Sequence, residues 1–136
     1  MKWKIITFDK ITDKRGSLVF IEQLKDIPFD IKRVYYIYGL DPRAVRGDHA
    51  HRELEQVMIA VHGRFTLELF DGFRKEIFVL DDPSKGVYIP KLVWCRFYDF
   101  DPETVILVLA SDYYKPEDYI RDFDEFMKIV RKEGDF

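Results

Sequence analysis

Apolar and polar residues alternate with a period of two along most of this chain, in short runs. Successive side chains of an extended strand point to opposite faces, so this pattern predicts half-buried β-strands. The runs are also rich in β-branched and aromatic residues, which favour strands. We expect strands at residues 4–8, 17–22, 33–38, 49–61, 64–70, 74–80, 87–89, 95–100 and 104–110.

Glycine, proline and aspartate separate these runs. They are typical of turns, because glycine reaches positive φ, proline fixes φ and aspartate hydrogen-bonds the nearby backbone. The pair Asp71-Gly72, between Phe70 and Phe73, is the best hairpin signal. Many short strands at regular spacing predict an all-β fold, either a small β-barrel or a two-sheet jelly roll.

The C-terminal tail departs from this alternation. From residue 116 to 131 apolar residues recur every three or four positions, which predicts an amphipathic α-helix packed on the outside of the barrel. The apolar positions are Tyr119, Ile120, Phe123, Phe126, Met127 and Val130. The acidic positions are expected on a solvated face of this helix, and they are Asp118, Asp122, Asp124 and Glu125.

Two strands are apolar on both faces, at residues 57–61 and 105–110. One face can fill the barrel, but the other also needs a cover. A partner subunit is the simplest cover, so we expect a homodimer. The alternative is that the terminal helix alone hides the second face.

Length and composition fit one soluble domain over residues 1–136. Charged residues make up 35% of the chain and the net charge is −3, so there is no basic excess of the kind that nucleic-acid binding requires. Cys95 is the single cysteine, which rules out an intrachain disulfide. Neither a signal-peptide core nor a run of membrane-spanning length is present, and we expect a cytoplasmic protein without a membrane partner.

The stretch Arg46-Gly47-Asp48-His49-Ala50-His51 carries the strongest chemical signal. On an extended strand His49 and His51 point to the same side. An ordinary core would have to supply each imidazole with a partner, so the pair favours metal binding or proton transfer over simple packing. Two histidines that only bond their neighbours remain the structural alternative.

The spacing of His49, His51, Gln56 and Gly63 resembles the first motif of the cupins, with an amide in place of the usual acid. In the region of the second motif, residues 90–99, Cys95 occupies the histidine position and Asp99 the asparagine position. Two imidazoles and an amide are a weak ligand set for iron, manganese or nickel. We therefore expect no metal, with zinc bound through Cys95 as the alternative.

Without a metal, a histidine pair can still move protons at neutral pH, and proton abstraction beside a carbonyl is the natural reaction. Tyr35, Tyr36 and Arg46 are candidates to stabilise the developing enolate. The strand at 33–38 should place Arg33 and Tyr35 on one face.

Three arginines, Arg15, Arg33 and Arg46, are candidates to clamp a diphosphate through planar donors, the alternative being surface ion pairs. His62 is expected at the surface. Cys95 is expected to be a buried, inert thiol.

Seven segments spread over the chain together resemble the nucleotide-sugar 3,4-ketoisomerases. These are metal-independent cupins that act on TDP-4-keto-6-deoxyglucose, and the resemblance runs from about Phe8 to Phe126. The segments are Arg15-Gly16-Ser17-Leu18, Ile27-Pro28-Phe29, Ile31-Lys32-Arg33-Val34-Tyr35-Tyr36-Ile37, Arg46-Gly47 with His49-Ala50-His51, Leu54-Glu55-Gln56-Val57, Val108-Leu109-Ala110-Ser111-Asp112-Tyr113-Tyr114 and Asp118-Tyr119-Ile120-Arg121.

The resemblance implies an isomerase that needs no cofactor and moves a proton between carbons 3 and 4 of a TDP-linked 4-keto-6-deoxy sugar. It makes His49 and His51 catalytic and implies a homodimer with exchanged N-terminal strands. The product would lead to 3-amino-3,6-dideoxy sugars of lipopolysaccharide O-antigen or S-layer glycan. The positions expected to bind substrate are Arg15, Arg33, Tyr35, Arg46, Gln56 and Cys95.

One departure from that family concerns Cys95, because relatives carry a basic residue after the tryptophan. This change affects how the sugar sits, while Arg15 favours the galacto over the gluco product. Rival functions are a sugar-nucleotide 3,5-epimerase, a binding cupin without chemistry and a metal-dependent dioxygenase. The epimerase would pair its histidine with an acidic tyrosine and an aspartate from elsewhere in the chain, and the sequence alone does not locate this pattern.

Overall fold

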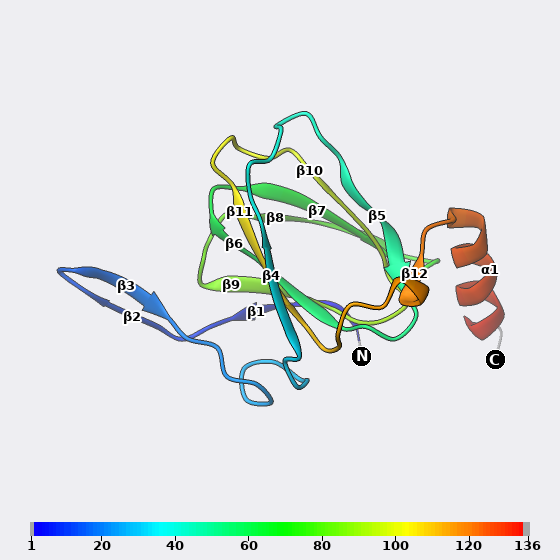
Figure 1. Cartoon of the computed structure of the whole chain (residues 1–136), viewed down its shortest axis with the longest axis horizontal. Coiled ribbons are helices and arrows are strands. Elements are labelled where there is room, and N and C mark those ends of the chain that lie inside the picture. The colour runs from blue at the N-terminus through cyan, green and yellow to red at the C-terminus, as the bar shows by residue number, and fades with distance from the viewer. Residues whose placement is uncertain (1, 135–136) are drawn as a thin grey trace.

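Two antiparallel five-stranded sheets face each other in the computed structural model, which describes residues 2–134 (Figure 1). The first sheet has the order β1 (Lys4–Thr7), β9 (Lys85–Ile89), β6 (Gln56–His62), β11 (Val105–Ala110) and β4 (Arg33–Ile37). The second has the order β12 (Tyr119–Ile120), β5 (Arg46–His51), β10 (Trp94–Tyr98), β7 (Phe65–Phe70) and β8 (Lys75–Leu80). This arrangement confirms the predicted jelly-roll fold.

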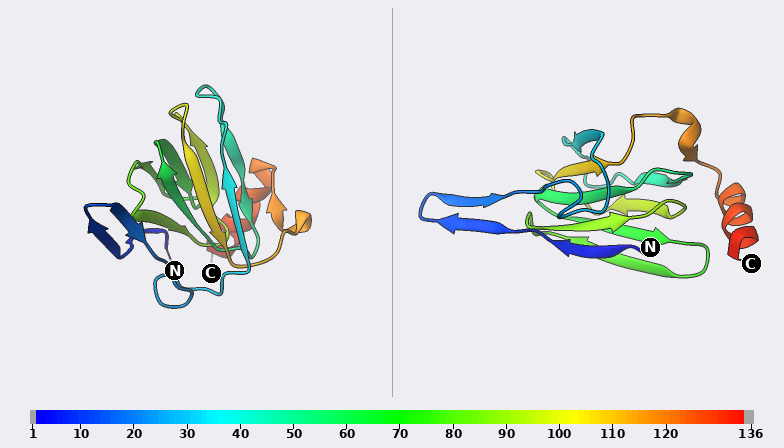
Figure 2. Two further views of the ribbon diagram at one scale, coloured as in Figure 1. Left: turned by 60° about the vertical axis from the view of Figure 1, so that its left-hand side comes forward. Right: turned by 90° about the horizontal axis from the view of Figure 1, so that it is seen from below.

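A separate hairpin, β2 (Lys10–Asp13) paired with β3 (Gly16–Val19), extends away from the two sheets, as Figures 1 and 2 show from three sides. After β11 the chain forms a 3₁₀ turn at Pro116–Asp118, then β12, and ends in helix α1 (Phe123–Gly134). The hairpin and the helix lie at opposite ends of the molecule (Figure 1).

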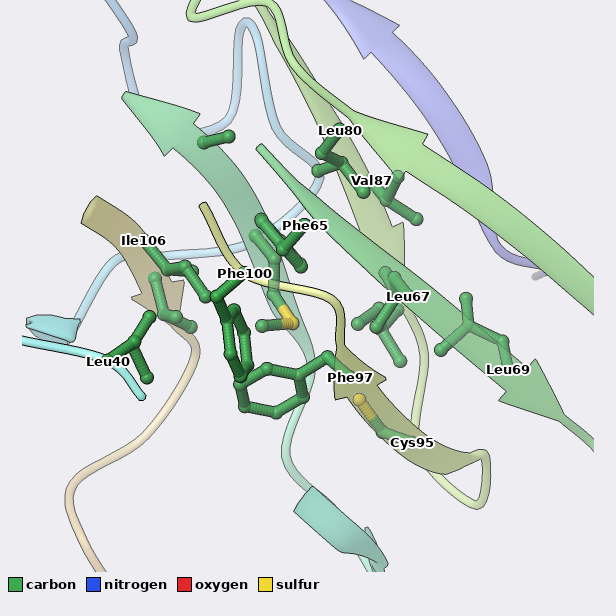
Figure 3. Close-up of a cluster of buried hydrophobic side chains, with 14 of the residues drawn as sticks. Leu40, Phe65, Leu67, Leu69, Leu80, Val87, Cys95, Phe97, Phe100 and Ile106 are labelled. Atoms are coloured by element: carbon green, nitrogen blue, oxygen red, sulfur yellow. The ribbon is translucent and has the colours of Figure 1, made fainter. Parts of the chain in front are cut away.

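Alternate residues of the facing strands fill the space between the sheets, as the period-two pattern predicts. Met58 and Ala60 of β6 and Leu67 and Leu69 of β7 are among the buried members of this core. Aromatic rings of Phe65, Phe97 and Phe100 close one end of it, and Figure 3 shows them packed beside Ile106 and Leu40.

The second apolar face of the first sheet is covered by the chain itself. Val57, Ile59 and Leu109 on this face pack with Phe8, Ile27 and Phe29 from the N-terminal segments. The two-faced strands therefore do not by themselves require a partner subunit.

Helix α1 is not the cover for that face, because it packs on the other sheet. Phe126 and Val130 cluster with Ala50 of β5, and Phe70 and Trp94 lie against the same cluster. The predicted position of the helix outside the barrel is confirmed.

Two predicted element boundaries are wrong. The single strand expected at 49–61 is two strands, β5 and β6, which lie in different sheets. The helix begins at Phe123 rather than at residue 116, because Asp122 caps it by accepting a hydrogen bond from the Glu125 N–H at 3.1 Å. The hairpin predicted at Asp71-Gly72 is confirmed between β7 and β8.

A β-bulge in β5 sets the orientation of the histidine strand. Gly47 and Asp48 have φ of 85° and 54°, and the register against β10 shifts so that Cys95 pairs with His49 while Arg96 pairs with Gly47. The extra residue breaks the alternation. As a result Arg46 and His49, three positions apart, line the same cavity.

Replacing Gly47 tests the bulge. A Cβ at Gly47 would lie 2.6 Å from the Cys95 carbonyl oxygen, whereas one at Gly39, where φ is 64°, would meet nothing within 4 Å. We expect Gly39→Ala to lower the free energy of unfolding by about 1 kcal/mol through backbone strain alone. Gly47→Ala should cost roughly 2 kcal/mol more because backbone must also move. Urea unfolding measures both, and equal losses would contradict the close approach.

Candidate active site

A cavity of about 410 Å³ opens between the two sheets, beside the bulge of β5. Five of the residues predicted to form the site line it together, although they come from four strands. Its lining residues are Tyr35, Ile37, Val45, Arg46, Gly47, His49, Gln56, Met58, Cys95, Phe97, Tyr119 and Arg121.

The two histidines lie side by side, as the strand alternation predicts. Their ring centroids are 5.0 Å apart and the two ring planes are nearly perpendicular. The centroid of the Tyr119 ring lies 5.0 Å from that of His49 and 4.5 Å from that of His51. His49 lines the cavity, whereas His51 is buried and does not. The pair therefore presents one imidazole to a ligand, with the second packed against it.

His49 is poised as a neutral base. Its Nδ1 lies 3.1 Å from the Gly47 carbonyl oxygen. A carbonyl only accepts hydrogen bonds, so Nδ1 carries the proton and Nε2 keeps its lone pair. Burial lowers the pKa of His49 to about 4, and the neighbouring His51 lowers it further in the same direction. At neutral pH the lone pair of Nε2 is free to take a proton.

His51 bonds a carboxylate that sequence analysis misplaced. Its Nδ1 lies 3.0 Å from Oδ2 of Asp118, whose side chain is only 14% exposed. Burial lowers the pKa of His51, while Asp118 opposes that shift. The expectation that Asp118 sits on a solvated helix face is wrong, because Asp118 ends a 3₁₀ turn before the helix begins.

Tyr35 is a hydrogen-bond donor in the cavity. Its hydroxyl donates to Oε1 of Gln56 at 3.4 Å, and burial raises the pKa of Tyr35 to about 12, so the phenol stays protonated. Tyr36, the alternative candidate, points to the opposite face and is 65% exposed. Of the two candidates, Tyr35 is therefore the one that lines the cavity.

The three predicted arginines are not brought together in one chain. Arg46 lines the cavity. Arg33 lies between the rings of Tyr35 and Tyr114, at 5.2 and 5.6 Å, and its buried Nε has no partner among the described residues. Arg15 is at the tip of the hairpin, is 90% exposed and pairs with Asp13.

Arg121 and Tyr119 are site residues that sequence analysis did not assign. The Arg121 guanidinium lies 4.4 Å from the centroid of the Tyr119 ring, and both line the cavity. They belong to the segment Asp118-Tyr119-Ile120-Arg121, which the resemblance had already singled out. The resemblance of that segment to the family was the one signal that could have identified these two residues, because no local periodicity marks them as part of a site.

Cys95 faces the cavity as a neutral thiol. It is buried, and this burial raises its pKa to about 12, as expected for an inert cysteine. A thiol is a poor zinc ligand, and no group of three His, Cys, Asp or Glu side chains within residues 2–134 is placed to hold a metal ion. The next residue, Arg96, points away from the cavity and lies 3.6 Å from Asp48.

The family model FdtA, described as WxcM-like, C-terminal, matches residues 1–131. The chain belongs to the FdtA family.

Other members of the FdtA family support this assignment over nearly the whole chain. A TDP-4-oxo-6-deoxy-α-D-glucose-3,4-oxoisomerase from Aneurinibacillus thermoaerophilus is 48% identical over 97% of this chain and 95% of its own. A mutant of the 3,4-ketoisomerase QdtA from Thermoanaerobacterium thermosaccharolyticum, solved with TDP-4-keto-6-deoxyglucose, is 44% identical with a TM-score of 0.94 and covers 96% of this chain and 95% of that one. A 3,4-ketoisomerase from Helicobacter canadensis is 46% identical with a TM-score of 0.93, and the match covers 96% of this chain and 98% of that one. The predicted resemblance is confirmed.

Sugar epimerases share the fold of this FdtA family member at low identity. A dTDP-4-dehydrorhamnose 3,5-epimerase from Bacillus anthracis is 14% identical, with a TM-score of 0.76 over 86% of this chain and 76% of its own. The structure does bring an aspartate, Asp118, to a histidine, which sequence analysis had not located. The fold is therefore shared, and the family assignment separates the two classes.

Within residues 2–134, no helical segment combines the length and the hydrophobicity that a membrane span needs.

His62 is at the surface as expected, with its Nε2 3.4 Å from a carboxylate oxygen of Glu103.

The half-buried, neutral His49 should make stability depend on pH. Its folded-state pKa of about 4 lies below the ordinary value of 6.5, so protonation favours the unfolded chain. The stabilisation is complete above pH 6.5 and is lost as the pH falls towards 4, by at most about 1.4 kcal/mol per pH unit. We expect the unfolding free energy of His49→Asn to fall less steeply in this window. Parallel curves from urea titrations of the two proteins would contradict a neutral, half-buried His49.

Proposed function

We propose that this protein is a nucleotide-sugar 3,4-ketoisomerase that converts TDP-4-keto-6-deoxyglucose to a TDP-3-keto-6-deoxyhexose. The observation that carries this proposal is the His49 imidazole, held neutral with its Nε2 lone pair free at the wall of the cavity. The substrates named for the relatives in the FdtA family support the same reaction.

The first half of the reaction uses the acidity of a proton beside a carbonyl. Nε2 of His49 takes the proton from carbon 3, the released electron pair forms a double bond between carbons 3 and 4, and the carbonyl electrons move onto oxygen 4. The protonated phenol of Tyr35 and the guanidinium of Arg46 are the donors in the cavity that can stabilise this oxyanion. Protonation of oxygen 4 gives the enediol.

The second half reverses these steps one carbon along. The hydroxyl group on carbon 3 loses its proton, a carbonyl forms at carbon 3, and the electron pair of the double bond takes a proton at carbon 4. Carbon 3 is oxidised and carbon 4 reduced within one molecule. The reaction therefore needs no external oxidant or reductant, in line with a cofactor-free enzyme.

We assign His49 as the base at carbon 3 and His51 as the second proton-transfer group. His49 faces the cavity, and the ring of His51 packs against it with the ring centroids 5.0 Å apart. The charge on either ring affects the other, because like charges at this distance repel.

Arg46 and Arg121 are the proposed diphosphate ligands. Both guanidiniums line the cavity within one chain, and planar donors suit phosphate oxygens. The exposed ring of Tyr114, which packs 5.9 Å from Tyr119, offers a surface on which the base can stack. Arg33 orients Tyr35 from behind by stacking on its ring.

We propose a homodimer in which the β2–β3 hairpins are exchanged. Ile11 and Leu18 on this hairpin are 60% and 57% exposed. An isolated two-stranded hairpin is marginally stable at best, so packing on a partner explains both its apolar surface and its extension from the sheets. Arg15 at the hairpin tip would then bind substrate in the partner's cavity.

The configuration at carbon 4 depends on which face of the enediol is protonated, and we propose the galacto product, on the basis of Arg15. Cys95 replaces a bulky basic side chain at the cavity wall, which leaves the sugar more room on that side. A 3-keto product suits an aminotransferase as the next enzyme, which is the route to 3-amino-3,6-dideoxy sugars.

The proposed reaction predicts that His49→Asn abolishes proton exchange. With TDP-4-keto-6-deoxyglucose in deuterated water, proton NMR of the wild type should show deuterium entering at carbons 3 and 4 and a new 3-keto sugar. His49→Asn should slow this at least about a thousandfold, since no other neutral base lies at the same position. Deuterium at carbon 5 would instead indicate a 3,5-epimerase, and tight TDP binding without exchange a binding protein. The coupling between protons 4 and 5, measured in ordinary water, distinguishes galacto from gluco.

The exchanged hairpin predicts a dimer that depends on Ile11 and Leu18. Light scattering should give the wild type a mass of twice the 16.4 kDa of one chain. The double variant Ile11→Asp, Leu18→Asp should be a folded monomer. Arg15→Ala should remain dimeric and raise KM roughly tenfold, because a charged contact to the ligand is lost. A monomeric wild type would refute the exchange.

A further inference from the structure

Asp118 is held rigidly against the strand that carries the histidines. Its Oδ2 lies 3.0 Å from His51 Nδ1, and its Oδ1 accepts the Glu53 N–H at 2.8 Å. Its main-chain carbonyl accepts the Arg52 N–H at 2.9 Å. Three contacts thus fasten one residue to three consecutive residues at the end of β5. Such a carboxylate has little freedom to turn away from the imidazole.

The contact determines where the proton of His51 resides. A carboxylate only accepts hydrogen bonds, so Nδ1 must carry the hydrogen and Nε2 must be the free nitrogen. Nε2 lies across the ring from Nδ1 and so faces away from Asp118. His51 therefore presents an unprotonated nitrogen, as a group that is to take up a proton must.

We propose that Asp118 is a positioning residue for proton transfer, which fixes the tautomer and ring orientation of His51 and stabilises its imidazolium form. The proposal rests on the function proposed above, since it concerns the second histidine of that reaction. It assigns a role to a residue that does not line the cavity.

The charges around His51 show why such a partner is needed. Arg33 on β4 and Arg121 after β12 both disfavour a positive charge on His51, and burial does so more strongly. His49 and the Tyr119 ring complete its surroundings, at 5.0 and 4.5 Å. Asp118 supplies the opposing negative charge, at hydrogen-bond distance.

The two histidines consequently differ in their supporting partners. His49 donates to a neutral backbone carbonyl, that of Gly47, whereas His51 donates to a carboxylate. A carboxylate stabilises an imidazolium far better than a carbonyl does. Asp118 thus makes His51 the member of the pair that better bears a proton, while His49 remains the neutral base that faces the sugar.

Asp118→Asn is the decisive variant, because it removes the charge at almost constant shape. An asparagine has one carbonyl and one amino group. If its carbonyl keeps the Glu53 N–H, its amino group faces His51 Nδ1 and forces the proton onto Nε2. We expect kcat to fall about a hundredfold to ten-thousandfold with little change in KM. The acid limb of the kcat profile should also move to lower pH, since a proton on His51 is no longer stabilised.

Long-range proton–nitrogen NMR reads the tautomer directly and needs no substrate. In wild-type protein His51 should be protonated on Nδ1, and in Asp118→Asn on Nε2. Asp124→Asn is the matched control, with the same substitution at an exposed position in the first turn of α1. This control should leave the tautomer and kcat unchanged.

Two outcomes would overturn the proposal. They are a wild-type His51 protonated on Nε2, or a folded Asp118→Asn protein that keeps its kcat. If Asp118→Asn does not fold, as circular dichroism would reveal, the wild-type tautomer still decides. Failure of the proposed function looks different, because wild-type protein would then show no exchange at carbon 3 even with His51 protonated on Nδ1.

Discussion

The close approach of Gly47 to the Cys95 carbonyl is the constraint on which the rest of the site depends. A side chain at this position would collide with β10, so only glycine permits the bulge at this separation. The bulge brings Arg46 and His49 to one cavity, and it turns the Gly47 carbonyl into the acceptor that fixes the His49 tautomer. The backbone geometry of the bulge therefore determines where these side chains lie and which nitrogen of His49 is protonated.

The second support of the site comes from the opposite end of the chain. The short strand β12 pairs Tyr119 with His51 and Ile120 with Ala50, which adds one edge to the second sheet. The buried Ile120 joins the cluster beneath α1, so the helix anchors this edge. Local order at the histidines therefore depends on packing formed far from them in sequence.

Alternation along the strands predicts which side chains share a face, but it does not place residues that lie in turns and loops. The strands, the inward face of Arg33 and Tyr35, and the adjacency of His49 and His51 all follow from a period of two. Asp118 and Arg121 could not be placed in this way, because they lie in a turn and a loop whose apolar spacing imitates the start of the helix. The cover over β6 was also missed, since nothing local links Phe8 or Ile27 to that strand.

The hairpin is joined to the core in a particular way. Phe8 precedes it and Ile27 follows it, and both are packed on the outer face of the first sheet. The chain therefore leaves and returns to one anchored surface, where Val19 and Ile21 also pack, whereas Ile11 and Leu18 on the hairpin stay exposed. Substitutions at the outer part of this hairpin can therefore accumulate without any repacking of the interior, as long as Phe8 and Ile27 keep their places.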